Sequence, residues 1–189
     1  YTEQGKGGWT GWTWNRDLFP NPKEFLGYLK QNDVKITLNL HPADGVASYE
    51  EKYSGLAKDM GVDPQSKQTI PWINSDKKFI KNMFKNVLTP MEKDGVDFWW
   101  LDWQQRIYDP KVKNLSNTWW INYAFFSNME KNRDTRPILY HRWGGLGNHR
   151  YQVGFSGDAV VSWKSLDFQP YFNSTASNVL YGYWSHDLG

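Results

Sequence analysis

Apolar and polar positions follow two different periods along this 189-residue chain. Over 34–40 they alternate strictly, and a period of two predicts a strand. Residues 96–102 form a mostly apolar run, which is typical of a strand buried on both faces. Shorter apolar runs predict three more strands, over 137–141, 153–156 and 180–185.

Between the predicted strands, apolar residues recur at the spacing of a helix face. Asn21 and Pro22 are typical of a helix start, with Asn as the N-cap and Pro in the first turn. Ser48 and Glu51 fit a capping box before a second helix, which Gly61 would end. Further helices are predicted over about 79–88, 117–132 and 165–178.

The alternation of strands and helices indicates an α/β fold with a parallel sheet. A doubly wound open sheet would more often carry a glycine-rich phosphate loop after its first strand, and the sequence has none there. Charged or polar residues instead follow four of the five predicted strands. Because a (β/α)8 barrel gathers its chemistry at the ends of several strands, the pattern favours this TIM-barrel fold.

Composition narrows the choice of ligand more than the choice of fold. The net charge of +2 provides no strong field for nucleic acid or a membrane surface, and we expect neither partner. The absence of cysteine excludes disulfides and thiolate metal sites. No apolar run approaches the roughly 20 residues of a transmembrane helix, and we expect no signal peptide. The 12 Trp residues, in a chain of mean hydropathy −0.75, favour a polar ligand with apolar faces, such as a sugar.

Three aspartates carry the candidate chemistry, because each ends a predicted strand: Asp102, Asp158 and Asp187. Glycoside hydrolysis needs two carboxyl groups on opposite sides of the scissile bond, one to attack or to activate water and one to donate a proton. Asp102 and Asp158 could take these parts, and Asp187 could hold sugar hydroxyls. A buried structural aspartate is an equally good interpretation of Asp102 taken alone.

An arginine and several aromatic side chains would complete such a site. Arg142 could bind hydroxyls and keep a neighbouring carboxylate ionised, or it could form a buried structural ion pair. We expect Asp158 to be buried against Phe155, and Trp100, Phe155 and Trp184 to line a common cleft. The four histidines are scattered without the spacing of a metal site, so no metal or other cofactor is expected.

Several ordered motifs resemble the family 31 glycoside hydrolases, the α-glucosidase family. They are Trp14–Pro20, Leu38–Pro42, Phe98–Trp103, Phe155–Asp158 and Trp184–Gly189, spread over essentially the whole chain. The resemblance implies that Asp102 is the nucleophile, Asp158 the acid/base and Asp187 a sugar-binding residue. Arg142 precedes Asp158 by 16 residues, which is similar to the family's spacing. The other candidates for substrate binding are Trp100, Trp103, Phe155, Trp184, His41 and His186.

The chain departs from the family after the nucleophile, where Trp103-Gln104-Gln105 replaces the Asn-Glu of many members, and this leaves the sugar open. The family's barrel also has an earlier strand with a further subsite aspartate and a last strand with a histidine, expected before Tyr1 and after Gly189. We therefore expect residues 1–189 to be part of a single catalytic (β/α)8 barrel domain, incomplete and holding roughly strands 3 to 7 with their helices. The remaining strands and β-sandwich domains would complete the full-length chain.

The sequence thus predicts a retaining α-glycoside hydrolase. It would act on an oligosaccharide or another α-glycoside by double displacement through a covalent glycosyl-enzyme. Two alternatives stay open. One is an α-transglycosylase with the same catalytic pair, and the other is a non-catalytic carbohydrate-binding protein, against which the presence of both aspartates argues.

Overall fold

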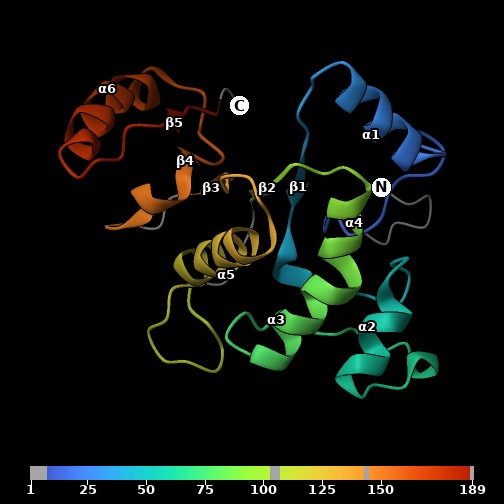
Figure 1. Cartoon of the computed structure of the whole chain (residues 1–189). Helices are drawn as coiled ribbons and strands as arrows, with labels where there is room; N and C mark the ends of the chain where they lie inside the picture. Colours follow the sequence, from blue (N-terminus) through green and yellow to red (C-terminus); the bar gives the residue numbers. More distant parts are fainter. Residues whose placement is uncertain (1–7, 103–106, 143–144, 188–189) are drawn as a thin grey trace.

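Five strands form one sheet in the computed structural model, which describes residues 8–102, 107–142 and 145–187. The strands are β1 (Thr37–Leu40), β2 (Phe98–Leu101), β3 (Leu139–Arg142), β4 (Gln152–Phe155) and β5 (Trp184–Ser185). Every neighbouring pair is parallel, and the order in the sheet follows the order in the chain (Figure 1). The predicted parallel sheet is confirmed, although most strands are shorter than predicted.

Six α-helices lie in the described part of the chain. They are α1 (Pro22–Gln31), α2 (Tyr53–Met60), α3 (Lys77–Met83), α4 (Thr89–Asp94), α5 (Asn117–Asn132) and α6 (Trp163–Ser177). Three short 3-10 helices are η1 (Pro42–Asp44), η2 (Pro64–Ser66) and η4 (Asn148–Tyr151). The connection from β3 to β4 breaks the alternation, because η4 replaces an α-helix there. A βαβ crossover needs about ten to twelve residues or more, and residues 143–151 are too few.

One long helix contacts β2, where Trp99 Nε1 donates to Glu92 Oε1 at 2.8 Å. It consists of α3, the π-helical turn η3 (Phe84–Leu88) and α4, which run on without a break. Pro90 has no N–H to bond the carbonyl one turn earlier, and this accounts for the widened turn before it.

The helix ends confirm two of the predicted signals and contradict one. The Asn21 side chain accepts a bond from the Glu24 N–H, and Gly61 ends α2 in the left-handed region at φ 80°. The predicted capping box is wrong. The Glu51 carboxylate binds Arg16 instead, and α2 begins only at Tyr53. The stronger charged partner therefore ties this segment to the N-terminal loop rather than to a helix.

The two faces of the sheet have different roles, because side chains alternate along a strand. Trp99 and Leu101 are buried against the helices, and the Trp99 ring lies edge-on to Phe125 of α5 at 6.5 Å. Trp100 and Tyr140 lie on the opposite face, where their rings are 5.2 Å apart. That opposite face leads to the candidate site.

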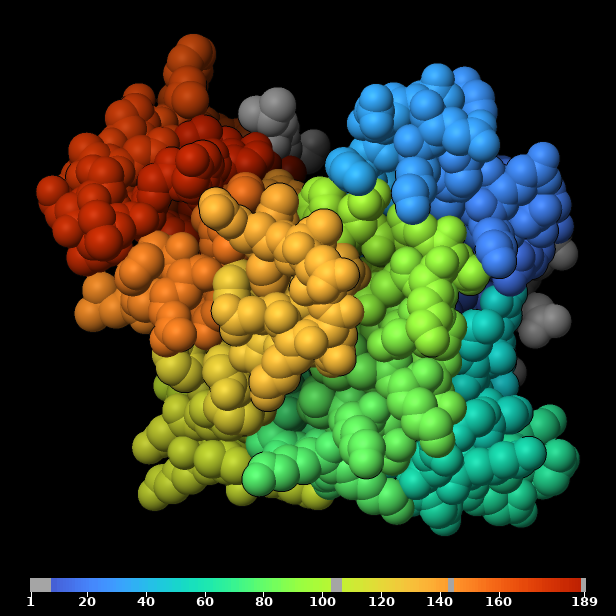
Figure 2. All heavy atoms as spheres, viewed as in Figure 1, coloured from blue at the N-terminus to red at the C-terminus, as the bar shows by residue number. Residues whose placement is uncertain are grey.

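Helix α6 packs less tightly than the others. None of its residues is buried, and Trp163, Leu166, Phe168 and Tyr171 are all exposed. Figures 1 and 2 show α6 and α1 at opposite sides of the molecule. Within the described residues, no helix combines the length and the apolar character needed to cross a bilayer.

Candidate active site

The candidate site lies where the C-terminal ends of β1 to β4 meet. Asp102 directly follows β2, Arg142 is the last residue of β3, and Asp158 follows β4. The parallel register places Leu101 beside both Leu40 and His141, and Arg142 beside Phe155. Since all the strands run in one direction, the residues that follow them gather at one edge of the sheet.

Polar side chains from the ends of β1 and β3, the two strands beside β2, hold Asp102. Its Oδ1 accepts a bond from Arg142 Nε at 2.7 Å. Its Oδ2 lies 2.9 Å from Asn39 Nδ2 and 2.8 Å from His41 Nε2, both from the end of β1. Because an ionised carboxylate only accepts hydrogen bonds, His41 carries a proton on Nε2 in this arrangement.

These contacts decide the charge of Asp102. Burial raises the pKa of its carboxyl group, but the hydrogen bonds from His41, Asn39 and Arg142 outweigh burial and bring the pKa to about 2. The ordinary value is 3.8, so Asp102 is ionised at any pH near neutral. An ionised carboxylate held by fixed donors is a chemically competent nucleophile.

Arg142 links Asp102 to the second candidate carboxylate. Its Nη2 donates to Asp158 Oδ1 at 3.0 Å, while its Nε holds Asp102. The Arg142 side chain is 8% exposed and that of Asp158 is 82% exposed. The expected burial of Asp158 against Phe155 is therefore wrong. Gly157 adopts φ 70°, and the chain turns there, after the buried Phe155.

Three aromatic rings pack beneath the charged groups. Trp100, Tyr140 and Phe155 have ring centroids 4.9 to 5.6 Å apart. The Arg142 Cζ atom lies 5.2 Å from the centre of the Phe155 ring, within the range of a cation–π contact. Trp100 and Phe155 therefore lie beside one another at the ends of their strands, and their lining of a cleft stays a prediction.

Trp184 does not join this group, so the expected common cleft is wrong for that ring. The register pairs Trp184 with Gly154, which points it to the helix-facing side of the sheet. Its ring lies 4.5 Å from Phe172 of α6, and His186 Nε2 lies 3.2 Å from Asn173 of the same helix. Trp103 lies outside the described residues.

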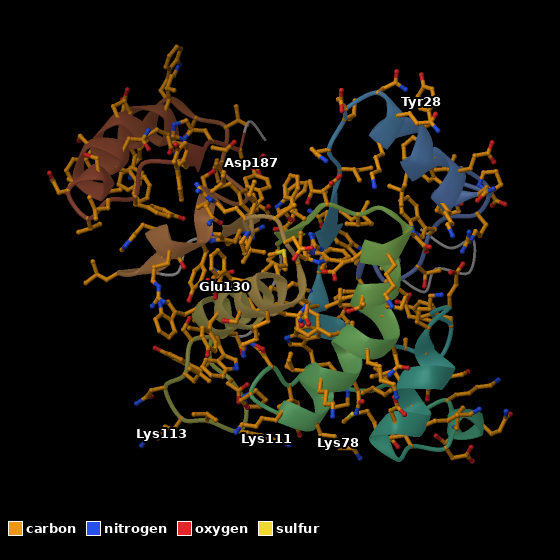
Figure 3. All side chains as sticks on the ribbon, in the orientation of Figure 1. Tyr28, Lys78, Lys111, Lys113, Glu130 and Asp187 are labelled. Atoms are coloured by element: carbon orange, nitrogen blue, oxygen red, sulfur yellow. The ribbon has the colours of Figure 1, made fainter. Side chains whose placement is uncertain are left out.

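Asp187 lies near the end of β4, as its place after β5 suggests. Its N–H donates to Ser156 Oγ at 2.9 Å, two residues before Asp158. Figure 3 shows Asp187 far from Lys78 and Lys111, which lie at the opposite end of the molecule. Asp187 and His186 also line a cavity of about 480 Å³ next to α6.

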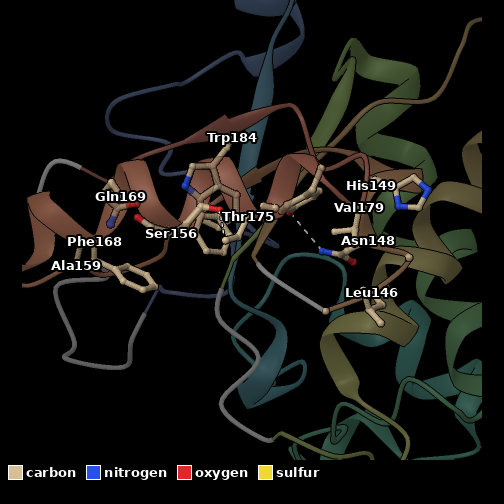
Figure 4. A pocket seen from close by; sticks show the side chains of 15 residues that line it. Leu146, Asn148, His149, Ser156, Ala159, Phe168, Gln169, Thr175, Val179 and Trp184 are labelled. Carbon is tan, nitrogen blue, oxygen red and sulfur yellow. Dashed lines mark hydrogen bonds between the residues drawn. The ribbon is translucent and has the colours of Figure 1, made fainter.

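A larger cavity of about 600 Å³ opens between η4, α6 and β5 (Figure 4). Its lining includes Asn148, Ser156, Phe168, Phe172 and Trp184. Asp102, Arg142 and Asp158 are not among its lining residues, so this cavity is distinct from the charged site.

Two residues of the site, Asn39 and Trp9, were not predicted from the sequence. Asn39 has the same period-two position as His41, so alternation places both on one face of β1, but only the register with β2 brings that face to Asp102. The Trp9 ring stacks on His41 at 5.2 Å and is 56% exposed. Its neighbour Gly11 has φ 83°, and a Cβ there would lie 2.3 Å from the Asn39 carbonyl oxygen. Such a close backbone contact has no signal in a single sequence.

The model of the glycosyl hydrolases family 31 TIM-barrel domain matches residues 1–189. Among solved structures, a GH31 α-xylosidase from a soil metagenome, complexed with xylose, has a TM-score of 0.70 and 18% identity, over 97% of this chain and 30% of that chain. The GH31 α-xylosidase of Xanthomonas citri has a TM-score of 0.62 and 17% identity, over 96% of this chain and 23% of that chain. A xylosidase from Aspergillus niger has a TM-score of 0.67 and 17% identity, over 99% of this chain and 32% of that chain.

The chain spans less than a third of the length of each of these three structures. No match is found among curated protein sequences. The fold agreement and the family match over all 189 residues lead to the same conclusion. The chain belongs to glycosyl hydrolase family 31, and its five strands are part of the TIM barrel of that family.

Proposed function

We propose that the full-length protein is a retaining α-glycoside hydrolase with Asp102 as the nucleophile and Asp158 as the acid/base. The observation that carries this proposal is the Arg142 bridge, in which one buried guanidinium binds both carboxylates. Two carboxyl groups that share one partner lie within a single small site, which double displacement requires. The surroundings of the two groups also fit, because Asp102 is ionised and nearly buried, whereas Asp158 reaches solvent.

In the first step, Asp102 Oδ attacks the anomeric carbon as the bond to the leaving oxygen breaks. Asp158 gives its proton to that oxygen, so the leaving group departs as an alcohol. The product is an ester between Asp102 and the sugar, with its anomeric configuration inverted. The exposed position of Asp158 suits this part, since the leaving group must pass to solvent.

In the second step, Asp158 takes a proton from water, and the water oxygen attacks the anomeric carbon. The ester bond breaks, Asp102 is ionised again, and the configuration returns to that of the substrate. Arg142, Asn39 and His41 stabilise the released carboxylate, because they already donate to it in the resting site.

The sugar would be held by groups around this pair. We assign hydroxyl binding to Asp187 and apolar contact to Trp100 and Phe155, and we add Trp9 at the rim beside His41. Similar solved structures are α-xylosidases, so α-linked xylose or glucose at the non-reducing end is the substrate class proposed. Trp103 and His186 remain candidates for substrate contacts.

A trapping experiment on the full-length protein tests this mechanism. A 5-fluoro-α-glycosyl fluoride of the xylo or gluco series forms the glycosyl-enzyme faster than water removes it, and mass spectrometry of peptides identifies the modified residue. We expect the label on Asp102 and no label in Asp102→Asn. Turnover with an aryl α-glycoside, followed by NMR, should release the α-anomer first.

Three outcomes separate this proposal from its alternatives. Release of the β-anomer would show an inverting enzyme and contradict the assignment. Transfer to an added sugar in preference to water would indicate a transglycosylase that uses the same residues. Sugar binding without any label or turnover would indicate a carbohydrate-binding protein.

A further inference from the structure

A buried polar cluster lies behind β3, on the side of the sheet away from Asp102. It consists of Asn122 on α5, His141 on β3 and Asn148 on η4, each at most 1% exposed. Buried polar groups cost stability unless they are hydrogen-bonded, so such a cluster calls for an explanation. Among the described residues, the hydrogen bonds of these three side chains go to one another, to Arg142 O and to the Tyr181 hydroxyl.

The cluster converges on one backbone atom, the carbonyl oxygen of Arg142. His141 Nδ1 lies 2.6 Å from it, and Asn148 Nδ2 donates to it at 3.3 Å. Asn122 Nδ2 in turn donates to Asn148 Oδ1 at 3.1 Å, which orients the Asn148 amide. His141 and Asn148 therefore hold the carbonyl at the end of β3 directly, and Asn122 supports Asn148.

His141 Nδ1 lies 2.6 Å from the Arg142 carbonyl oxygen, 3.1 Å from Asn122 Nδ2 and 3.2 Å from Asn148 Nδ2. The contact with the carbonyl is the shortest, and a carbonyl oxygen can only accept, so we assign the proton of the neutral ring to Nδ1. The two amides then donate to Asn148 Oδ1 and to Arg142 O instead. Burial lowers the pKa of His141 to about 4, although the bond to Arg142 opposes this shift. The ring is therefore neutral near pH 7, and it holds the carbonyl as a dipole rather than as a charge.

We propose that His141 and Asn148 are positioning residues that hold the end of β3 so that the Arg142 guanidinium spans Asp102 and Asp158. The inference rests on the proposed function. Its physical basis is the length of the Arg142 side chain, which donates to Asp102 Oδ1 at 2.7 Å and to Asp158 Oδ1 at 3.0 Å. Both hydrogen bonds depend on the direction of the Arg142 Cα–Cβ bond. Fixing the carbonyl from behind fixes that direction.

The test uses the full-length protein with paired variants. His141→Leu removes the donor while keeping an apolar side chain, and His141→Asn restores a donor near the position of Nδ1. Tyr151→Phe is the matched control. The Tyr151 ring lies edge-on to His141 at 6.2 Å, and its hydroxyl has no partner among the described residues, so its removal takes nothing from Arg142.

We expect His141→Leu to lower kcat for aryl α-glycosides at least about tenfold with KM changed less than about twofold, because small displacements of a catalytic group mainly cost rate. His141→Asn should recover most of that loss, and Tyr151→Phe should resemble the wild type. A crystal structure of His141→Leu should show Arg142 Nε beyond hydrogen-bond distance of Asp102. If His141→Leu does not fold, Asn148→Ala takes its place in the same measurements.

Two results would overturn the inference. One is a variant structure in which Arg142 keeps both carboxylate bonds, and the other is an equal loss of kcat in Tyr151→Phe. If the wild-type enzyme shows no glycosidase turnover, the proposed function fails, but the crystal structures still decide whether His141 positions Arg142.

Discussion

Arg142 donates from Nε to Asp102 Oδ1 at 2.7 Å, and both side chains are almost closed to solvent. A guanidinium offers several donors in a fixed plane, so the same group also reaches Asp158. The pair is both a buried ion pair and a link between the two candidate catalytic groups. The sequence left open whether Arg142 forms a buried ion pair or keeps a catalytic carboxylate ionised, and these two interpretations are therefore compatible.

Arg142→Lys tests this link. Lysine keeps the charge but presents it at one point, so it cannot hold both carboxylates in the observed geometry. We expect kcat/KM to fall by about 10²-fold and the free energy of unfolding to fall by about 2 kcal/mol or more. The control is Arg16→Lys at the exposed pair with Glu51, where a loss of no more than about 1 kcal/mol is expected. Similar losses in both variants would show that the Arg142 bridge has no special role.

The depressed pKa of Asp102 predicts a pH-dependent stability. A carboxyl group whose pKa is lower in the folded state stabilises the fold above its unfolded value, and this contribution disappears as pH falls through the folded value. For Asp102 it amounts to about 2 kcal/mol, lost between about pH 4 and pH 2. Urea unfolding of wild type and Asp102→Asn at several pH values should show the stability difference shrinking by this amount. A constant difference would mean that the Asp102 pKa is not depressed.

Asp158→Asn should separate acid catalysis from nucleophilic attack. Substrates with good leaving groups need little protonation, so their first step should be nearly unchanged, whereas unactivated glycosides should lose about 10²- to 10⁴-fold. Rapid-mixing measurement of the released aryl group isolates this step. Asp102→Asn should abolish turnover of both substrate types. Equal loss for both types in Asp158→Asn would exclude Asp158 as the general acid.

Trp9→Ala tests the rim of the site. The ring is exposed and stacks on His41, which binds Asp102, so it is placed to contact a bound sugar. We expect KM to rise roughly three- to tenfold, with unfolding free energy changed by less than about 0.5 kcal/mol. Tyr28→Ala on the outer face of α1 (Figure 3) removes a comparably exposed ring and should leave KM unchanged. An unchanged KM in Trp9→Ala would remove Trp9 from the sugar site.

Gly11→Ala tests the backbone contact that holds this rim. A Cβ would lie 2.3 Å from the Asn39 carbonyl oxygen at a positive φ, so we expect a loss of unfolding free energy of about 1–3 kcal/mol or more. Gly27→Ala in α1 is the control, because nothing lies within 4 Å of its added Cβ. That helix substitution should stabilise by about 0.5–1 kcal/mol. Thermal unfolding of the two variants should therefore shift in opposite directions, and a neutral Gly11→Ala would contradict the close contact.

The parallel sheet and the catalytic candidates were accessible without a structure. Alternation over 34–40 and the apolar run over 96–102 are local signals, and both strands are found near those places. The positions of Asp102, Arg142 and Asp158 at the ends of successive strands follow from the same kind of signal, because parallel strands end at one edge.

Contacts between distant residues were decided only in the folded chain. Asn39 and Asp102 are 63 residues apart, and no periodicity pairs their side chains. Trp184 has the same local signal as Trp100, yet the register of β5 turns it toward α6. The turn at Gly157 leaves Asp158 exposed, although it lies three residues beyond the buried Phe155. The local sequence pattern predicts which side chains of a strand share a face, whereas strand register and packing determine which residues those side chains contact.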